Sequence, residues 1–366
     1  MQRLQLPALL FVLIHSISLS SVLPTMVPPT TTRRKGPKDL PKLPLSVFTP
    51  PNTGTQESFQ LPPSPSALHP AQVIDANVVS KDIYYAQWKK DSSPALTEKV
   101  NGVVLALPAE QLQNAINDLK SSSEPSQILS FIIPFNLENP DPSVEALLAS
   151  STVPTSLSAI FTKNSPEAVQ GLRWALQRGH AVDIDIQATL SDSLLEGFED
   201  MIAKATSDLE VVPSVVLSNI LPPPHDLDLP IVKLMNHPTY LAFQSQVAAL
   251  SLIPQVHVKF LPPAWDAPTP QTPFPGSPIE AVDTQQLKEW KRRIKMYLAP
   301  VMEAFGYERI IFGSSPSSSS RSLSKVGDWY EIARESLAEV GVEQNYVDAV
   351  FYGNAARLYG KKVEKS

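Results

Sequence analysis

Residues 309–316 read Arg-Ile-Ile-Phe-Gly-Ser-Ser-Pro, and the rest of the chain is organised around this stretch. The apolar run predicts a buried strand, and the Gly-Ser turn predicts where that strand ends. Helical patterns follow at about 325–341 and in a segment that closes with Gly-Asn-Ala-Ala-Arg-Leu-Tyr-Gly at 353–360. We interpret the stretch as the last strand of a (β/α)₈ barrel. Ser315 then lies where the strand ends of such barrels carry their chemistry.

Length and composition permit one such barrel and argue against several classes of function. The chain has 366 residues, of which 43% are hydrophobic and 18% charged, and its net charge is −6. A barrel of about 250 residues with a tail fits that length, and the charge gives no reason to expect a nucleic-acid partner. There are no cysteines and 6 histidines, so disulfides and thiolate metal sites are excluded.

Residues 1–27 have the pattern of a targeting segment. Arg3 precedes an uncharged apolar run over 4–19, and small serine residues follow, as is typical of a secretory signal. We therefore expect secretion. Mitochondrial import is the alternative, because basic residues cluster between 33 and 42, and an extension with neither role is a third. The run is short and contains Pro7, so we expect no stable membrane span.

Residues 28–70 are rich in proline, serine and threonine and contain few large apolar side chains. Such a composition cannot bury enough surface to offset the entropy lost on ordering, which predicts a disordered or polyproline-like arm. The folded domain is then expected to span 71–360.

Removal of residues 1–65 is expected to leave the melting temperature nearly unchanged, because this segment lacks a core-forming pattern. Thermal denaturation of the full-length and shortened chains measures the effect. A large fall in melting temperature would mean that the arm packs on the domain.

Strand and helix patterns alternate beyond residue 71. The expected strands span 72–79, 100–107, 127–135, 157–162, 182–187, 211–220, 256–261 and 310–314. The expected helices span 109–122, a segment starting at 142, 166–178, 192–205, 230–252 and 284–305. This alternation predicts parallel βαβ units, and eight of them close a barrel. An open doubly wound sheet is the alternative. It would usually carry a glycine-rich phosphate loop after its first strand, which this chain lacks.

Strand parity identifies candidate catalytic residues. In the fifth expected strand, Val-Asp-Ile-Asp-Ile-Gln, the apolar residues should face the helices, which turns Asp183 and Asp185 inward. The same alternation sends His257 and Lys259 of the seventh strand inward. We predict that these four serve as acid, base and anion holder. The alternative is a buried ion-pair network that holds the barrel together.

A long proline-rich loop over 262–282 follows the seventh expected strand. Loops of this length within a compact domain are often functional, and Trp265 would then cover an apolar ligand at the barrel mouth. The alternative is a surface insertion made rigid by proline. Near the eighth strand, Arg321 is a candidate anion-binding residue, with a solvated surface role as its alternative.

Five stretches resemble the amidohydrolase-related barrel hydrolases, a family that includes metal-dependent decarboxylases and lactonases. Residues 74–79, Ile-Asp-Ala-Asn-Val-Val, are similar to that family's first-strand Ile-Asp-X-His-X-His. Residues 215–220 and 257–260 are similar to its Val-Leu-Asp-His-Leu-Gly and Val-Lys-Leu-Ser-Gly strands. Residues 310–316 resemble its Phe-Gly-Ser-Asp-Trp-Pro strand, and 353–360 its closing Gly-Asn-Ala-X-Arg-Leu-Tyr-Gly. The resemblance spans about 73–360 and implies a barrel hydrolase or lyase.

The departures from this pattern fall on the family's metal ligands. Asn77 and Val79 occupy the first-strand histidine positions, Asn219 the mid-barrel histidine, and Ser315 the final aspartate. The resemblance implies a divalent metal, which needs imidazole nitrogen and carboxylate oxygen that valine and serine cannot supply. We therefore expect no metal and no other cofactor. The predicted ligand-binding residues are Asn77, Asn219, Trp265, Ser315 and Arg321.

Three functions follow as hypotheses. The first is a metal-free barrel that binds a small organic acid or an ester-like molecule at its carboxyl-terminal mouth, with hydrolase or lyase activity or with turnover lost. The second is an interaction protein that uses the barrel as a scaffold and the proline-rich arm as its contact. The third is a metallohydrolase with relocated ligands, in which Asp183, Asp185 and His257 hold the metal. The oligomeric state is left open.

Overall fold

The structure, a computed structural model, describes residues 67–80, 83–121, 127–186, 191–218, 229–265, 267–273, 281–318 and 323–360. The predicted targeting segment and the expected arm up to residue 66 lie outside the described residues. Within the described part no helix has both the length and the apolar character needed to cross a membrane.

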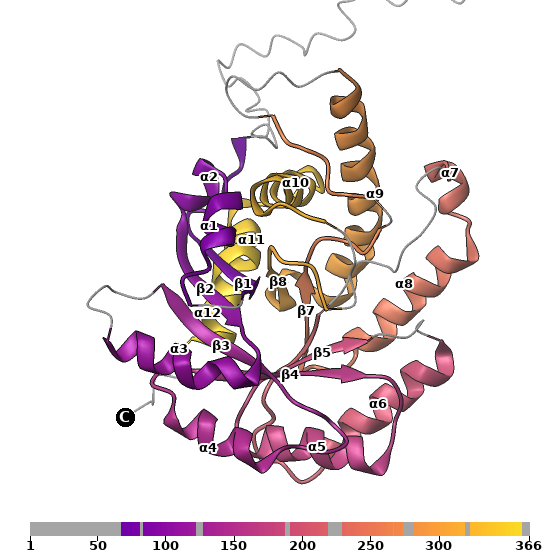
Figure 1. The fold of residues 1–366 in the computed structure, drawn as a ribbon. Coiled ribbons are helices and arrows are strands. Elements are labelled where there is room, and N and C mark those ends of the chain that lie inside the picture. Colours follow the sequence, from indigo (N-terminus) through magenta and orange to yellow (C-terminus); the bar gives the residue numbers. More distant parts are fainter. Residues whose placement is uncertain are drawn as a thin grey trace, which may run out of the picture. The chain divides into compact units, whose positions relative to one another are not determined.

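Eight parallel strands form one sheet in which spatial order follows chain order (Figure 1). The strands are β1 (Val73–Val79), β2 (Val100–Ala106), β3 (Ile128–Pro134), β4 (Thr155–Phe161), β5 (Val182–Ile186), β6 (Val215–Leu217), β7 (Val256–Phe260) and β8 (Ile310–Phe312). The sheet curls until β8 approaches β1, where Ser315 N donates to Asn77 O at 2.9 Å. The structure is therefore a nearly closed (β/α)₈ barrel, which confirms the predicted fold class.

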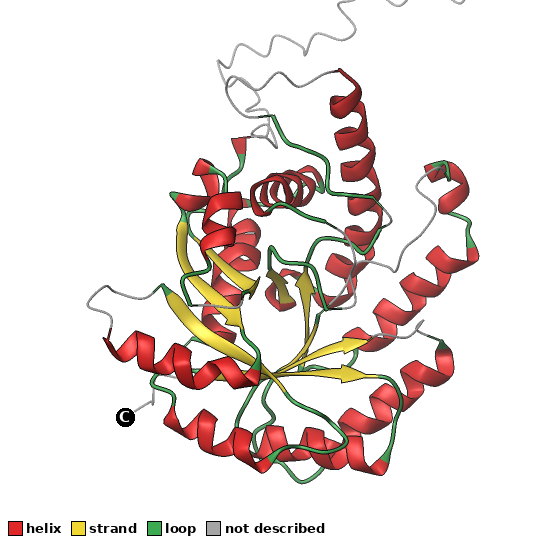
Figure 2. Ribbon diagram, in the orientation of Figure 1, coloured by secondary structure: helices red, strands yellow, loops and turns green. Residues whose placement is uncertain are grey.

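Helices surround the sheet (Figure 2). They are α1 (Ala86–Asp91), α2 (Pro94–Thr97), α3 (Ala109–Ser121), α4 (Pro142–Ser150), α5 (Pro166–Gln177), α6 (Asp192–Thr206), α7 (Ile231–Leu234), α8 (Pro238–Ser251), α9 (Ala281–Phe305), η3 (Tyr307–Arg309), α10 (Val326–Glu339), α11 (Gln344–Asp348), η4 (Ala349–Gly353) and α12 (Asn354–Tyr359). Serine side chains cap several of these helices: Ser165 directly precedes α5 and Ser191 directly precedes α6, and each accepts a hydrogen bond from a backbone N–H. Pro166 is the first residue of α5, and its ring fixes the backbone angle φ close to the helical value, which favours the start of a helix.

Several elements differ from the expected boundaries, and the helix expected over 230–252 is divided into α7 and α8. Of the strand expected over 211–220, β6 covers Val215–Leu217; Val211 is exposed, and residues 219–220 lie outside the described residues. The short helices α1 and α2 were not predicted, because elements of 6 and 4 residues are too short to show a helical period.

The packed part of the chain begins before residue 71. Leu68 belongs to the hydrophobic core, and its carbonyl accepts from the buried Arg334 Nη1 at 2.9 Å. His69 O accepts from Gln344 Nε2 at 2.8 Å. These residues, assigned to the arm from composition, are held by α10 and α11.

The core has an outer and an inner layer. The outer layer lies between strands and helices and contains most of the buried apolar side chains. The inner layer is a small apolar cluster inside the barrel, to which α12 contributes Ala355 and Tyr359. Asn354 holds α12 against the start of β8, because its Nδ2 donates to Tyr307 O at 2.7 Å and to Ile310 O at 2.8 Å. The closing segment 353–360 therefore packs at the amino-terminal end of the strands.

Candidate functional site

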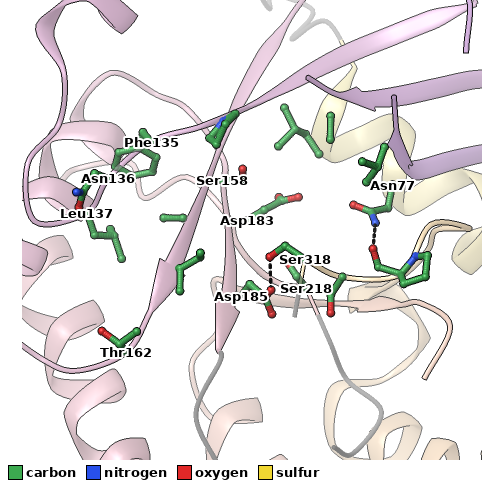
Figure 3. A pocket seen from close by; sticks show the side chains of 18 of the residues that line it. Asn77, Phe135, Asn136, Leu137, Ser158, Thr162, Asp183, Asp185, Ser218 and Ser318 are labelled. Carbon is green, nitrogen blue, oxygen red and sulfur yellow. Dashed lines mark hydrogen bonds between the residues drawn. The ribbon is translucent and has the colours of Figure 1, made fainter. Parts of the chain in front are cut away.

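A cavity of about 960 Å³ lies at the carboxyl-terminal ends of the strands (Figure 3). Its lining comes from β1 to β5, from the segments that follow β3, β4, β6 and β8, and from the start of α5. The volume is within the range of small-molecule sites, roughly 300–1,000 Å³, and strand ends are where barrels of this kind place their chemistry. We refer to this cavity as the mouth pocket.

Asp183 and Asp185 of β5 both line the mouth pocket, as strand parity predicted. β5 pairs with β4 so that Ser158 is opposite Asp183 and Ile160 is opposite Asp185, and all four side chains face the same side of the sheet. Asp185 Oδ2 accepts from Ser318 Oγ at 2.5 Å (Figure 3). The hydroxyl of Ser318 was not among the predicted site residues, because nothing in the serine run over 315–320 distinguishes it.

Lys259 of β7 lies in the barrel interior with no exposed surface and forms an ion pair with Asp183. Its Nζ also donates to Asn77 Oδ1 at 3.2 Å and lies 5.5 Å from the centre of the Tyr359 ring. Asp183 Oδ1 accepts a second hydrogen bond, from the Tyr359 hydroxyl at 2.8 Å. The buried ion pair that we gave as the alternative to catalysis is therefore present: Asp183 lines the mouth pocket, and Lys259 is enclosed beneath it.

Tyr359 connects the closing helix α12 to this floor. Burial raises the pKa of its hydroxyl well above the usual value, and the negative charge of Asp183 raises it further. The phenol therefore keeps its proton and remains a donor to Asp183. Sequence reasoning missed this contact because Tyr359 is far along the chain from β5, and only the closed barrel brings the two together.

Asn77 reaches the mouth pocket because β1 is irregular. The pairing of β1 with β2 shifts between Asp75 and Val78. Ile74 belongs to the inner apolar cluster, whereas beyond the shift Asn77 and Val79 are the residues that line the pocket. Without the shift, strict alternation from Ile74 would turn Asn77 and Val79 toward the helices. A bulge of this kind reverses the alternation for the residues that follow it, so both side chains face the barrel interior at the pocket.

Ser315, predicted to bind a ligand, lines the mouth pocket but also joins β8 to β1. Its Oγ accepts from Val79 N at 3.1 Å, and its carbonyl accepts from Asn77 Nδ2 at 2.8 Å. These contacts hold the seam of the barrel together, so its hydroxyl and carbonyl both have structural roles.

A buried carboxyl group that sequence reasoning did not single out lies beside the same seam. Asp75 accepts from Trp88 Nε1 at 2.7 Å, from Ser314 N at 2.9 Å and from Asn77 N at 3.1 Å. Burial raises the pKa of Asp75, although these hydrogen bonds lower it in part. The contacts tie α1 and the end of β8 to β1 on the side away from the pocket, so we assign Asp75 a structural role.

His257 lies apart from the pocket, contrary to the expectation that it joins Asp183, Asp185 and Lys259. It precedes Lys259 by two residues on β7, which places it nearer the amino-terminal end of the barrel. Its Nδ1 is 3.1 Å from Gln255 O, a group that only accepts, so Nδ1 carries the proton. Strand parity predicts the face of a residue but not its height along the barrel axis, so the sequence alone could not place His257 relative to the pocket.

The stability of the protein is expected to depend on pH through His257. Burial lowers the pKa of His257 below 6.5, and the positive charges of Arg357 and Arg309 lower it further, against the effect of the hydrogen bond to Gln255. The unfolded chain then binds this proton more readily. The contribution of His257 is therefore present above about pH 6.5 and lost as the pH falls through the lower, folded-state value.

Urea denaturation of the wild type and of His257→Gln between about pH 7.5 and pH 5.5 tests this. We expect stability to fall with pH more steeply in the wild type than in the variant. Parallel profiles would show that His257 has the same proton affinity in both states.

Trp265 does not cover the mouth pocket. The side chain is buried and packs edge-on against Trp290 of α9, with ring centres 4.8 Å apart. We predicted that Trp265 covers a ligand; in the structure it instead belongs to the hydrophobic core between β7 and α9. Two further predicted ligand-binding residues, Asn219 and Arg321, lie outside the described residues, as do residues 266 and 274–280 of the expected lid.

Comparison with known proteins gives structural similarity only. No family model matches the chain, and no curated protein matches its sequence. A solved amidohydrolase from Burkholderia multivorans has 13% identity, covers 79% of this chain and 99% of its own, and has a TM-score of 0.48. A putative 2-pyrone-4,6-dicarboxylic acid hydrolase from Pseudomonas putida has 14% identity, coverage of 81% and 100%, and a TM-score of 0.47. A 2,6-dihydroxybenzoate decarboxylase from Rhizobium has 11% identity, coverage of 79% and 98%, and a TM-score of 0.37.

Proposed function

We propose that this chain is an amidohydrolase-related barrel that binds a small organic molecule at the mouth pocket without a divalent metal. One observation carries the proposal. The ammonium group of Lys259 is fully buried beneath the pocket, held between the Asp183 carboxylate and the Asn77 carboxamide. An organic acid and an ester-like molecule are the two ligand classes that the sequence resemblance implies.

The residues beneath the pocket suit an ammonium ion better than a divalent metal. Both oxygens of Asp183 already accept hydrogen bonds, one from Lys259 and one from Tyr359. Asn77 offers a neutral oxygen, and that atom accepts from Lys259. Among the described residues, no three histidine or carboxylate side chains are close enough to share a metal ion. A dication placed here would meet the positive charge of Lys259 and a ligand set without imidazole.

The chemistry that such a pocket offers belongs to its carboxylates and hydroxyls. Asp183 and Asp185 both line the mouth pocket, whereas Lys259 is enclosed beneath it and His257 is nearer the other end of β7. Among the four predicted catalytic residues, proton transfer to or from a bound molecule would therefore involve these aspartates. This narrows the predicted catalytic group from four residues to two.

A fragment screen by ligand-observed NMR tests the proposed binding site. Ile160→Asp places a charge in the pocket wall, where Ile160 is 48% exposed. Leu252→Asp is a matched control, because Leu252 is 81% exposed and belongs to a separate surface groove. We expect fragments that bind the wild type and Leu252→Asp but bind Ile160→Asp weakly or not at all.

Two results would contradict the proposed site. One is a wild-type protein that binds no fragment. The other is a set of fragments that bind Ile160→Asp as well as the wild type, since those fragments must lie elsewhere.

A further inference from the structure

The outer face of α8 differs from the outer faces of the helices on either side of it. α8 packs between α6 and α9 on the outside of the barrel (Figure 1). The exposed residues of α6 include Glu196 and Lys204, and those of α9 include Lys288 and Arg292. The 14 residues of α8 include no charged side chain. A helix face that meets water normally carries charged residues, so the composition of α8 indicates a face that is covered.

This face is apolar along its length. Ala248 and Leu252 follow Leu241 after about two and about three helical turns, which places all three on the same side of the helix. Leu241 is 53% exposed and Leu252 is 81% exposed. Val232 and Met235 of α7, just before the start of α8, are 76% and 56% exposed. We refer to the surface formed by these five residues as the α8 face.

The two ends of the α8 face have complementary shapes. At the α7 end, Val232 and Met235 present large apolar side chains to solvent. At the other end a groove of about 360 Å³ lies between α6 and α8. Its apolar lining includes Ile202, Ala203, Leu252, Ile253 and Pro254. When two copies pack with their α8 helices antiparallel, the α7 end of each copy lies against the groove of the other, and a two-fold axis makes both contacts at once.

The charges at the two ends favour the same arrangement. Lys233 of α7 is exposed, and Glu199 of α6 lines the groove at the opposite end. Antiparallel copies bring the lysine of each toward the glutamate of the other, whereas parallel copies would bring like charges together. Ser245, exposed near the middle of α8, would meet its own counterpart, and a hydroxyl group can both donate and accept.

The length of the α8 face matches a stable protein interface. A helix of 14 residues such as α8 is about 21 Å long, and α7 and the groove extend the face beyond its two ends. Each partner of a stable complex contributes about 800 Å², which corresponds to a patch about 32 Å across. A second copy of the chain therefore fits the face in size as well as in charge.

We propose that this chain forms a two-fold symmetric homodimer in which the α8 faces of two copies pack antiparallel. The apolar side chains at the α7 end of each copy contact the groove between α6 and α8 of the other. This proposal does not rest on the proposed function, because no residue of α7 or α8 is among the described residues that line the mouth pocket.

Sedimentation velocity of the full-length chain tests the dimer. We expect the wild type at micromolar concentration to have twice the chain mass of 40.0 kDa. Leu241→Asp should weaken association by at least about 100-fold, because each copy would bury a carboxylate without a partner. Ile160→Asp is the matched control and should remain dimeric, since it places the same charge at a comparably exposed position in the mouth pocket.

A single cysteine tests the geometry of the interface. The chain contains no cysteine, so Ser245→Cys introduces the only thiol, close to the proposed two-fold axis. A short bismaleimide reagent joins two thiols only when they lie close together, and we expect it to convert this variant to a covalent dimer. Ser193→Cys, at an exposed position in α6, is the matched control and should not be cross-linked.

Three results would overturn the proposal. The first is a monomeric wild type, including a monomer that binds phosphatidylcholine vesicles and loses this binding in Leu241→Asp, which would assign the α8 face to a lipid surface. The second is a dimer that persists in Leu241→Asp, since the two copies then associate elsewhere. The third is a Ser245→Cys variant that is cross-linked no better than Ser193→Cys, and this result decides the question even if Leu241→Asp does not fold.

Discussion

Lys259→Met is expected to lower the free energy of unfolding by about 3–5 kcal/mol, the cost of leaving a buried charge without its partner. Lys259 and Asp183 are both buried, so solvent cannot replace the lost contact. The Tyr359 hydroxyl would remain as a donor to Asp183, but a neutral donor does not balance the carboxylate charge. Urea denaturation of the purified variant measures the loss.

A double-mutant comparison identifies the partner of Lys259. Lys259→Met combined with Asp183→Asn removes both charges, so it should recover part of the lost stability. Lys259→Met combined with Asp185→Asn is the matched control, because Asp185 accepts from Ser318 and is not the ion-pair partner of Lys259. Equal recovery in the two double variants would contradict the pairing. Wild-type stability in all three would show that Lys259 is not buried against a carboxylate.

Gly313→Ala is expected to destabilise the barrel by about 1–3 kcal/mol through overpacking at its seam. A Cβ added at Gly313 would lie 2.7 Å from Asn77 Cβ and 3.2 Å from Asn77 N. It would also lie 2.6 Å from Leu261 Cδ2, which leaves no direction for a small adjustment. Since Asn77 also binds Lys259, the substitution acts on the site as well as on the seam.

Gly353→Ala is the control for Gly313→Ala. Gly353 has helical angles, φ −60 and ψ −40, and the atom nearest to an added Cβ would be Asp348 O at 3.9 Å. Alanine should be neutral here or stabilising by up to about 1 kcal/mol, because it restricts the unfolded chain without a clash. Thermal denaturation of both variants measures the difference. If Gly313→Ala is as stable as Gly353→Ala, the seam is not tightly packed.

The order of strands and helices could be predicted because each element carries its own pattern. The strand expected at 310–314 ends in a Gly-Ser sequence, and helices such as 166–178 begin at a serine cap followed by proline, so local signals mark both boundaries. The predicted sixth strand began too early, at residue 211, because the valines at 211 and 212 are typical strand residues. In the structure Val211 is exposed. Burial depends on the tertiary fold, which a local pattern does not contain.

The candidate site could be predicted only in part. The alternation of residues in β5 and β7 was enough to predict that Asp183 and Lys259 face the barrel interior, where the structure shows them as an ion pair. The contributions of Tyr359 and Ser318 depend on contacts between distant segments, at sequence separations of 176 and 133 residues. No periodic pattern encodes such contacts.

The metal content of the purified full-length chain tests the central claim most directly. The protein is prepared without chelators and analysed for zinc, manganese and iron, and its melting temperature is measured before and after chelation. Because the Lys259 ammonium lies between Asp183 and Asn77, we expect far less than stoichiometric metal and no change in melting temperature. Stoichiometric zinc or manganese, with a fall in melting temperature on its removal, would contradict the proposal that Lys259 is the cation beneath the pocket.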